Sequence, residues 1–303
     1  MSPTTGPRFL VGMRRAPVVA PRATLPTLGR WEIVRPIYEG SMFRVVQARP
    51  AEHELRSGDP HYALKVLLPR WSHVPRAVEL LQREALVGRT VSHAHLVPVL
   101  SSRLNEAPQY VALPWLAGET LAARLTSGAL APPLAVWIAR QVAEALEVLH
   151  TAGWLHGDVK PDNVMINAQG HATLIDLGFA RRRGERLSTF DECLRYTPAY
   201  VPPELFTSLE PDPRGDLYSL GVTLYEAVSG VRPFNGGTIV DLVRQHKESR
   251  AADLGRVAPD APSALCRLVH EMLAKDPLRR PRSAREVADR LLDLEIELFD
   301  WRR

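Results

Sequence analysis

Two acids, a lysine and an asparagine stand within HGDVKPDNVMI, residues 156–166. So dense a set of polar groups directly before an apolar strand is hard to explain by folding alone. A four-residue turn, a second apolar strand and the triplet Asp-Leu-Gly follow, and this order predicts a β-hairpin. If Asn167 pairs with Ala172, the hairpin brings Asn163 opposite Asp176 at its open end.

The oxygen atoms gathered at that end suit a magnesium ion. Mg²⁺ accepts amide and carboxylate oxygens, here from Asn163 and Asp176, and takes its other ligands from water and phosphates. Asp158 lies five residues before Asn163 and is expected to accept the proton of an incoming hydroxyl beside the metal. The simpler alternative makes Asp158 and Asn163 turn and capping residues, and their combination with Asp176 argues against it.

A lysine and an acid are predicted to pair in the preceding part of the chain. The segment 61–68, HYALKVLL, alternates so that Lys65 shares a strand face with Ala63. Nineteen residues after Lys65, Glu84 falls on the apolar stripe of a helix. Burying either charge alone costs several kcal/mol, so an ion pair is expected, and such a lysine could hold phosphates. The alternative is two surface charges whose heads reach solvent.

Bulk properties indicate an ordinary soluble protein. The 303 residues are 45% hydrophobic and 24% charged, with a formal charge of +4, so nucleic-acid binding is not expected. Cys193 and Cys266 form neither a metal-binding spacing nor a disulfide framework. No apolar run is long enough to span a membrane, and the N-terminus lacks the apolar core of a signal peptide. We therefore expect a cytoplasmic protein without a membrane span.

Composition divides the chain into four parts. Residues 1–29 hold five prolines, four arginines and no acid, which predicts a flexible basic arm. Residues 30–113 are β-rich with one main helix, residues 114–118 form a hinge, and residues 119–303 are mostly helical. The predicted fold class is α+β, with a small β-rich lobe in front of a larger helical lobe.

Taken together and in this order, the motifs resemble the bacterial eukaryotic-like (Hanks-type) Ser/Thr protein kinases over about residues 31–295. YALK resembles the strand of the ATP-binding lysine, and QREA resembles the helix that carries its acidic partner. HGDVKPDN resembles the catalytic loop and DLG the metal-binding triplet. The resemblance implies a bilobal kinase fold that uses ATP and Mg²⁺, with Mn²⁺ as an alternative metal, on protein substrates.

The resemblance also assigns roles to individual residues. Those implied to be catalytic are Asp158 as base, Lys160 at the transferred phosphate, Asn163, and Thr197 near the base. Those implied to bind the nucleotide are Lys65, Glu84, Gly40, Val45, Ala63, Leu113, Pro114, Leu116 and Met165. Asn163 and Asp176 are the implied metal ligands.

Kinases of small molecules share the His-Gly-Asp loop, so they are an alternative. Lys160 is typical of Ser/Thr protein kinases instead. YTPAYVPPE, residues 196–204, resembles their substrate-docking segment and supplies Glu204 for an ion pair with Arg280. Asp216 matches the residue that braces the catalytic loop from behind. The ordered series favours a protein kinase.

The phosphate-covering loop departs from the pattern. Residues 38–45 read YEGSMFRV, so Tyr38, Gly40 and Phe43 stand at three positions where the family has glycine. Losing two glycines could cost on the order of 1 kcal/mol each in backbone fit and weaken ATP binding. Phe43 is a candidate lid against water. The damaged loop also makes a pseudokinase, a binding scaffold without catalysis, the main alternative function.

Gly157 is the second departure, because many regulated kinases have arginine there (RD kinases) to bind a phosphate on the activation segment. Its absence gives a loop of the non-RD type. We predict little dependence of activity on phosphorylation at Ser188 or Thr189, the expected autophosphorylation sites. Arginines at 181–183 could replace the missing charge, or could simply form a solvated basic loop.

Overall fold

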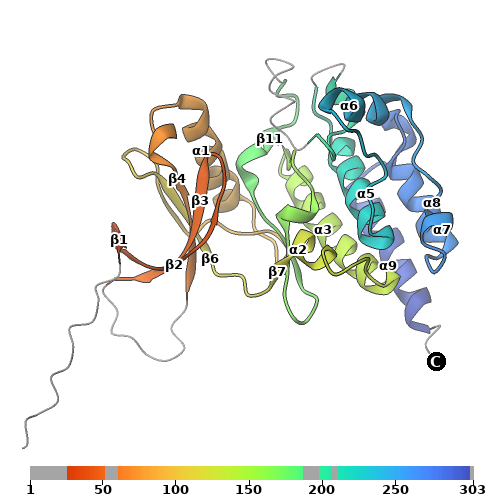
Figure 1. The fold of residues 1–303 in the computed structure, drawn as a ribbon, viewed down its shortest axis with the longest axis horizontal. Coiled ribbons are helices and arrows are strands. Elements are labelled where there is room, and N and C mark those ends of the chain that lie inside the picture. Colours follow the sequence, from red (N-terminus) through yellow and green to blue (C-terminus); the bar gives the residue numbers. More distant parts are fainter. Residues whose placement is uncertain (1–25, 52–60, 187–197, 207–209, 301–303) are drawn as a thin grey trace, which may run out of the picture.

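A six-stranded antiparallel sheet forms the N-terminal lobe of the protein, in the strand order β1-β2-β3-β4-β6-β5. The computed structural model describes residues 26–51, 61–186, 198–206 and 210–300. Figure 1 shows the sheet at one end of the molecule, with helix α1 against it. The strands are β1 (Thr27–Leu28), β2 (Trp31–Glu39), β3 (Phe43–Pro50), β4 (Tyr62–Leu67), β5 (Ser101–Arg103) and β6 (Tyr110–Pro114).

Two apolar layers form, one on each face of this sheet, because successive side chains of β4 point to opposite faces. Leu64 and Val66 pack with Trp31 on one face. Leu67 packs on the other face with residues of α1 (Pro75–Thr90), whose inward stripe includes Leu81. Glu84 also belongs to that stripe, as its helical spacing predicts. The short 3₁₀ helix η1 (Pro69–Trp71) joins β4 to α1.

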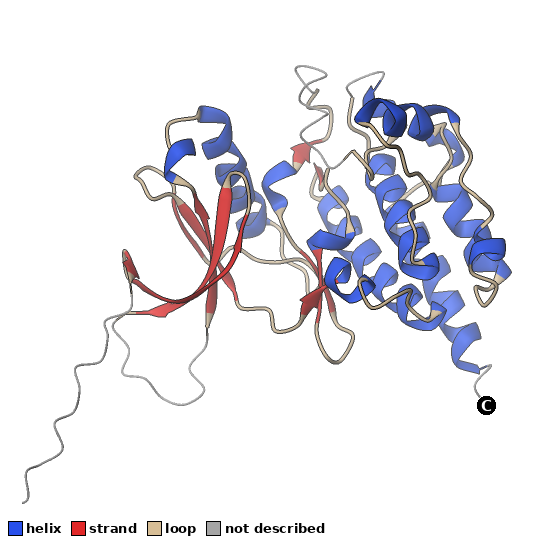
Figure 2. Cartoon of the chain, viewed as in Figure 1, coloured by secondary structure: helices blue, strands red, loops and turns tan. Residues whose placement is uncertain are grey.

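The C-terminal lobe is mostly helical, as Figure 2 shows. Its helices are α2 (Leu121–Leu125), α3 (Pro132–Thr151), α5 (Pro213–Ser229), α6 (Ile239–Glu248), α7 (Leu254–Val257), α8 (Ser263–Met272) and α9 (Ala284–Asp300). Almost every residue of α5 after its first turn is buried, which makes it the centre of this lobe. The observed architecture confirms the predicted α+β class with a β-rich lobe and a helical lobe.

Short strands and 3₁₀ turns carry the polar motifs of the C-terminal lobe. The strands are β7 (Glu119–Thr120), β8 (Trp154–Leu155), β9 (Val164–Ile166), β10 (Ala172–Leu174) and β11 (Arg181–Arg182). The 3₁₀ turns are η2 (Pro161–Asn163), η3 (Leu177–Phe179), η4 (Pro203–Phe206) and η5 (Pro277–Arg279).

The predicted hairpin is present, but its predicted register is wrong by one residue. Ala172 pairs with Ile166, and the Asn167 N–H donates to His171 O at 3.1 Å, so Asn167 is not opposite Ala172. At the open end, Asn163 O accepts from Ile175 N at 2.9 Å. Asp176 therefore comes one residue later than predicted, where the chain is already turning into η3.

The two lobes are tied together beside the hinge. Leu174 of β10 donates its N–H to His95 O at 2.9 Å and accepts from the Val97 N–H at 3.0 Å. Gly118 lies against the hairpin so tightly that a Cβ there would be 2.0 Å from Ile166 O. These contacts join the N-terminal lobe and the hinge to the hairpin that carries the polar motifs.

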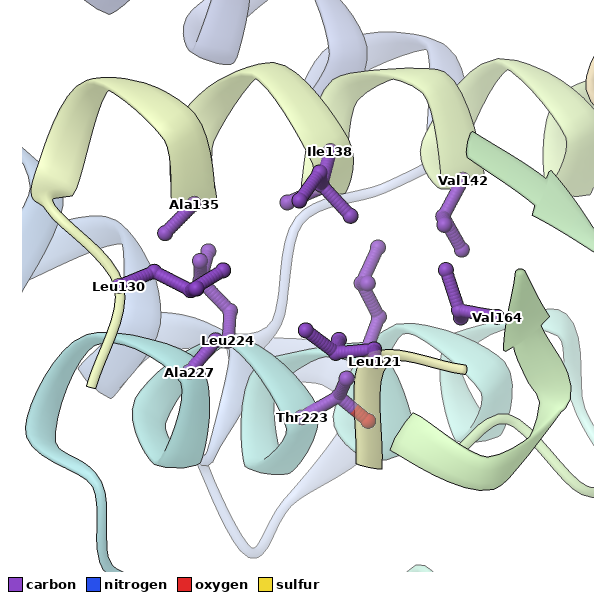
Figure 3. Close-up of a pocket in the computed structure, with 11 residues that line it drawn as sticks. Leu121, Leu130, Ala135, Ile138, Val142, Val164, Thr223, Leu224 and Ala227 are labelled. Atoms are coloured by element: carbon purple, nitrogen blue, oxygen red, sulfur yellow. The ribbon is translucent and has the colours of Figure 1, made fainter. Parts of the chain in front are cut away.

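An apolar void of about 10 Å³ lies inside the helical lobe, between α3, α5 and the strand of Val164 (Figure 3). Its one polar lining group, the Thr223 hydroxyl, already donates to Ser219 O at 2.9 Å. A void this small and apolar is a packing feature rather than a ligand site. None of the helices in the described parts of the chain is both long and apolar enough to cross a membrane.

Candidate active site

Lys65 stands where the two lobes meet and contacts two carboxylates. Its Nζ donates to Glu84 Oε2 at 2.8 Å and to Asp176 Oδ1 at 2.7 Å. Lys65 and Glu84 are 8% and 1% exposed, so the predicted ion pair is present and buried. The contact with Asp176 spans 111 positions of sequence and joins β4 to the end of the hairpin.

The charges in this trio are strongly coupled. Burial by itself would lower the pKa of Lys65, but the carboxylates of Asp176 and Glu84 outweigh burial and raise it. Burial raises the pKa of Glu84, and Lys65 offsets only part of that effect. Burial would also raise the pKa of Asp176, but the Lys65 charge dominates and lowers it. Lys65 is therefore a protonated amine and Asp176 an ionised carboxylate near neutral pH.

Asp176 has a backbone conformation that few residues other than glycine adopt. Its φ is 66° and its ψ 76°, and it is the one non-glycine residue with positive φ among those the structure describes. A residue held in such a region costs about 1–3 kcal/mol, and its neighbours must hold it there. The contact from Lys65 and a 3.3 Å hydrogen bond from the Gly178 N–H do so.

Asp158 is buried and has its carboxylate oriented by two donors. Lys160 Nζ lies 2.7 Å from Asp158 Oδ2, and Asn163 Nδ2 donates to the same oxygen at 2.9 Å and to Asp158 O at 2.7 Å. Burial raises the pKa of Asp158, and the Lys160 charge offsets only part of this rise. A carboxylate with a raised pKa, fixed by its neighbours, is a suitable proton acceptor.

The loop before Asp158 is held from behind by α5. The Asp216 carboxylate accepts from the backbone N–H of His156 at 2.8 Å and of Gly157 at 2.9 Å, and it also contacts His150 Nε2 at 2.8 Å. Burial would raise the pKa of Asp216, but His150 opposes burial and the pKa is lowered. Gly157 has a φ of 79°, a left-handed conformation that glycine adopts without strain.

The oxygen donors at the end of the hairpin fit a magnesium ion. Asn163 uses its Nδ2 to bind Asp158, which leaves its Oδ1 as the atom for a metal. Asp176 Oδ1 accepts hydrogen bonds from Lys65 and Gly178, which leaves its Oδ2 as the atom for a metal. No set of three or more His, Cys, Asp or Glu side chains within the described ranges is placed to hold a metal alone. A magnesium ion here would take further ligands from water and phosphates, as it usually does.

The hinge presents a backbone group suited to an adenine ring. Hydrogen bonds from Leu67 N to Gln109 O and from Trp115 N to His61 O show which backbone groups of β6 point toward β4 and which point away from it. In that alternation the Pro114 C=O points away from β4. Strand β5 pairs only with residues 110–112, so it does not reach Pro114.

Apolar side chains predicted to enclose adenine come from three segments around this hinge. Val45 pairs with Lys65 across β3 and β4, and Ala63 pairs with Leu113 across β4 and β6. Met165 lies on β9, opposite Thr120 of the chain that follows the hinge. Val45, Ala63, Leu113, Leu116 and Met165 are all partly exposed.

The phosphate-covering loop forms a tight turn despite its missing glycines. The Gly40 N–H donates to Phe43 O at 2.8 Å, and neither Tyr38, Gly40 nor Phe43 has a positive φ. Tyr38 and Phe43 therefore cause no left-handed backbone strain in this conformation. The Phe43 ring centroid lies 4.9 Å from Lys65 Nζ, within range of a cation–π interaction.

The predicted ion pair between Glu204 and Arg280 is present and largely buried. Arg280 Nη1 and Nη2 each lie 2.7 Å from one oxygen of Glu204. Thr197, Ser188, Thr189 and Cys193 lie outside the described residues.

Comparison with known proteins gives the family of the chain. The protein kinase domain family matches residues 31–291. The chain belongs to this family. Serine/threonine-protein kinase pkn2 of Myxococcus xanthus is 33% identical over 271 residues, which make up 87% of this chain and 32% of pkn2. PknA of Mycobacterium tuberculosis, also a serine/threonine-protein kinase, is 31% identical over 277 residues, 89% of this chain and 62% of PknA. The chain thus spans less than two thirds of either relative.

One contact of this protein kinase domain was not predicted from the sequence. Arg83 of α1 donates to Glu185 Oε2 at 2.7 Å and to Ala180 O at 3.0 Å. Arg181 Nη1 lies 3.3 Å from Glu185 Oε1, and the Arg182 N–H donates to Oε2 at 3.0 Å. Of the arginines at 181–183, Arg181 thus contacts this carboxylate with its side chain and Arg182 with its backbone N–H. The only feature of the sequence that pointed to this contact was the run of arginines at 181–183.

Proposed function

We propose that this protein is a kinase that transfers the γ-phosphate of ATP to Ser or Thr side chains of proteins, with Mg²⁺ as cofactor. The observation that carries the proposal is the position of Lys65, whose Nζ contacts both Glu84 and Asp176. A cation of the small lobe is thereby placed beside the acid of the large lobe, near Asp158. Phosphoryl transfer needs such positioning and charge neutralisation more than covalent chemistry.

In this proposal each polar side chain has one task. Lys65, held by Glu84, binds the α- and β-phosphates. Asp158 orients the substrate hydroxyl and accepts its proton, and its raised pKa favours that transfer. Lys160, which already lies 2.7 Å from Asp158, neutralises charge at the transferred phosphate.

Asn163 Oδ1 and Asp176 would hold the metal ion, with Mn²⁺ as an alternative to Mg²⁺. When bound, the metal neutralises charge on the phosphates. The Pro114 carbonyl and the Leu116 N–H are proposed to bind the edge of the adenine ring, and Val45, Ala63 and Met165 to sandwich its faces. Leu113 is proposed as the gatekeeper residue. Thr197 is proposed to stand near the substrate hydroxyl.

The catalytic loop is proposed to be of the non-RD type, because Gly157 stands where regulated kinases have arginine. Autophosphorylation at Ser188 or Thr189 would then be a by-product rather than a requirement. We place the activity in the cytoplasm, on the basis of the cysteine usage.

A pseudokinase scaffold is the second candidate, favoured by the loss of two glycines from the phosphate-covering loop. The complete set of Lys65, Asp158, Asn163 and Asp176 opposes it, since a scaffold has no need of all four. A small-molecule kinase is the third candidate, and the Glu204–Arg280 pair opposes it because that pair secures a docking segment for proteins.

The test uses the full chain with γ-labelled ATP, Mg²⁺ and a mixture of protein substrates, beside an Asp158→Asn variant. Label on Ser or Thr only with native Asp158 is the expected result. Thermal stabilisation by ATP without any label on protein would establish the pseudokinase instead. Label on an added aminoglycoside or choline, but not on protein, would establish the third candidate.

A further inference from the structure

The turn at residues 40–43 is fastened to the segment that follows β4. Arg70 Nη2 and Trp71 Nε1 both donate to the Ser41 carbonyl oxygen, each at 2.8 Å. The Leu68 N–H donates to Met42 O at 2.9 Å. Two side chains of η1 thus converge on one carbonyl that lies about 30 positions earlier in the chain.

These anchors also set the direction of a backbone donor. The peptide group is planar and trans, so the Met42 N–H points opposite to the Ser41 C=O. Fixing that carbonyl toward η1 therefore fixes the Met42 N–H away from η1. Among the residues that the structure describes, no acceptor is bonded to this N–H. A free, oriented backbone N–H is the group that phosphate-binding loops present to an anion.

The same turn is placed beside the lysine. Its last residue, Phe43, lies opposite Leu67 of β4 and puts its ring 4.9 Å from Lys65 Nζ. The ring also packs in the small apolar cluster that includes Met42 and Trp71. The anchored turn therefore lies next to the lysine at the phosphate end of the proposed site.

We propose that Arg70 and Trp71 are positioning residues for the phosphates of ATP. The proposal rests on the proposed function of the Lys65 site. In a glycine-rich loop, free φ angles let the backbone adapt to the phosphates. Here no residue of the turn has a positive φ, and the two side-chain donors instead hold the turn in a single conformation. The hydrogen bonds from Arg70 and Trp71 take the place of the conformational freedom that the absent glycines would give the turn. Because the turn is already ordered, less conformational entropy is lost when ATP binds.

The variants remove the donors and keep the packing. Trp71→Phe deletes the indole N–H and leaves an aromatic ring, and Arg70→Met deletes the guanidinium and leaves an apolar stem. Arg70→Lys keeps one donor for the carbonyl. The matched control is Arg103→Met, because Arg103 pairs with Glu106 on β5 and does not contact the turn.

The measurement is the dissociation constant, by calorimetry on the full chain with Mg²⁺, for ATP and for adenosine. Each single variant should weaken ATP binding about threefold to tenfold, as expected for one hydrogen bond, and the double variant tenfold or more. Adenosine, which has no phosphates, should bind with unchanged affinity. Arg70→Lys should retain most of the ATP affinity, and Arg103→Met all of it. In kinetics the KM for ATP should rise more than kcat falls.

Unchanged ATP affinity in the double variant would overturn the proposal. So would equal weakening of ATP and adenosine, which would indicate general damage to the lobe. Tighter ATP binding would show that the anchored turn obstructs the site. A native protein that binds ATP but transfers no phosphate would refute the proposed kinase function and leave this inference testable. A native protein that binds no ATP would refute both.

Discussion

Arg83 and Glu185 join α1 to the segment after Asp176 through a 2.7 Å ion pair. Arg83 is the sequence neighbour of Glu84, so its ion pair with Glu185 helps to position the helix whose Glu84 binds Lys65. Glu185 also accepts from the Arg182 N–H and contacts Arg181. A permanent carboxylate thus bridges the helix and the segment, and no added phosphate is needed to make that bridge.

The first prediction concerns phosphorylation of the segment. A Ser188→Ala/Thr189→Ala double variant should keep kcat within about twofold, because Glu185 already supplies the negative charge. Glu185→Gln should lower kcat about threefold to tenfold by weakening a charge-assisted contact. Steady-state kinetics on a protein substrate measure both. Glu106→Gln is the control, because Glu106 pairs with Arg103 at an exposed position just after β5. A collapse of kcat in the double variant would show that phosphorylation is required after all.

The second prediction concerns pH. Asp158 must be ionised to accept a proton, and burial raises its pKa, so activity is lost as pH falls through a value above that of an ordinary aspartate. Lys160 lowers this pKa. Lys160→Met should therefore move the acid limb of the kcat/KM profile to higher pH, whereas Lys160→Arg should leave it in place. An acid limb at the same pH in Lys160→Met would disprove Asp158 as the titrating base.

The third prediction concerns the hinge. A Cβ on Gly118 would meet Ile166 O at 2.0 Å, and Gly118 has a φ of 128°. Gly128 has a similar φ of 109° but open space around its Cα. Gly128→Ala should cost about 1–3 kcal/mol of unfolding free energy for backbone strain. Gly118→Ala should cost a further 1–3 kcal/mol or so, because the hinge must move off the hairpin. Urea unfolding of both variants compares them, and equal losses would contradict the close contact.

The fourth prediction concerns the lid role of Phe43. Its ring lies 4.9 Å from Lys65 Nζ, where it would keep water from the phosphates. Phe43→Gly should raise the rate of ATP hydrolysis measured without a protein substrate, and Phe43→Leu, which keeps apolar bulk, should raise it less. Phosphate release reports the rate. Hydrolysis at the native rate in Phe43→Gly would end the lid hypothesis.

Local sequence patterns were sufficient to predict much of the candidate site. The alternation of β4 and the apolar stripe of α1 each belong to one segment, so they predicted that Lys65 and Glu84 both face inward and pair. The pair Glu204–Arg280 and the brace at Asp216 came from the ordered motifs and the family resemblance, and both contacts are present. The hairpin was predicted, but a polar turn does not determine its own register, and the pairing differs by one residue.

The α+β class, the kinase family and the inward residues of the main elements could be predicted from the sequence, because periodicity and motif order depend on neighbours along the chain. Two contacts could be found only in the folded chain: Arg83 binds Glu185, 102 positions away, and Arg70 and Trp71 both bind the Ser41 carbonyl. Such contacts depend on where two separately formed elements come to lie, and that is set by packing within and between the two lobes. No local pattern contains that information.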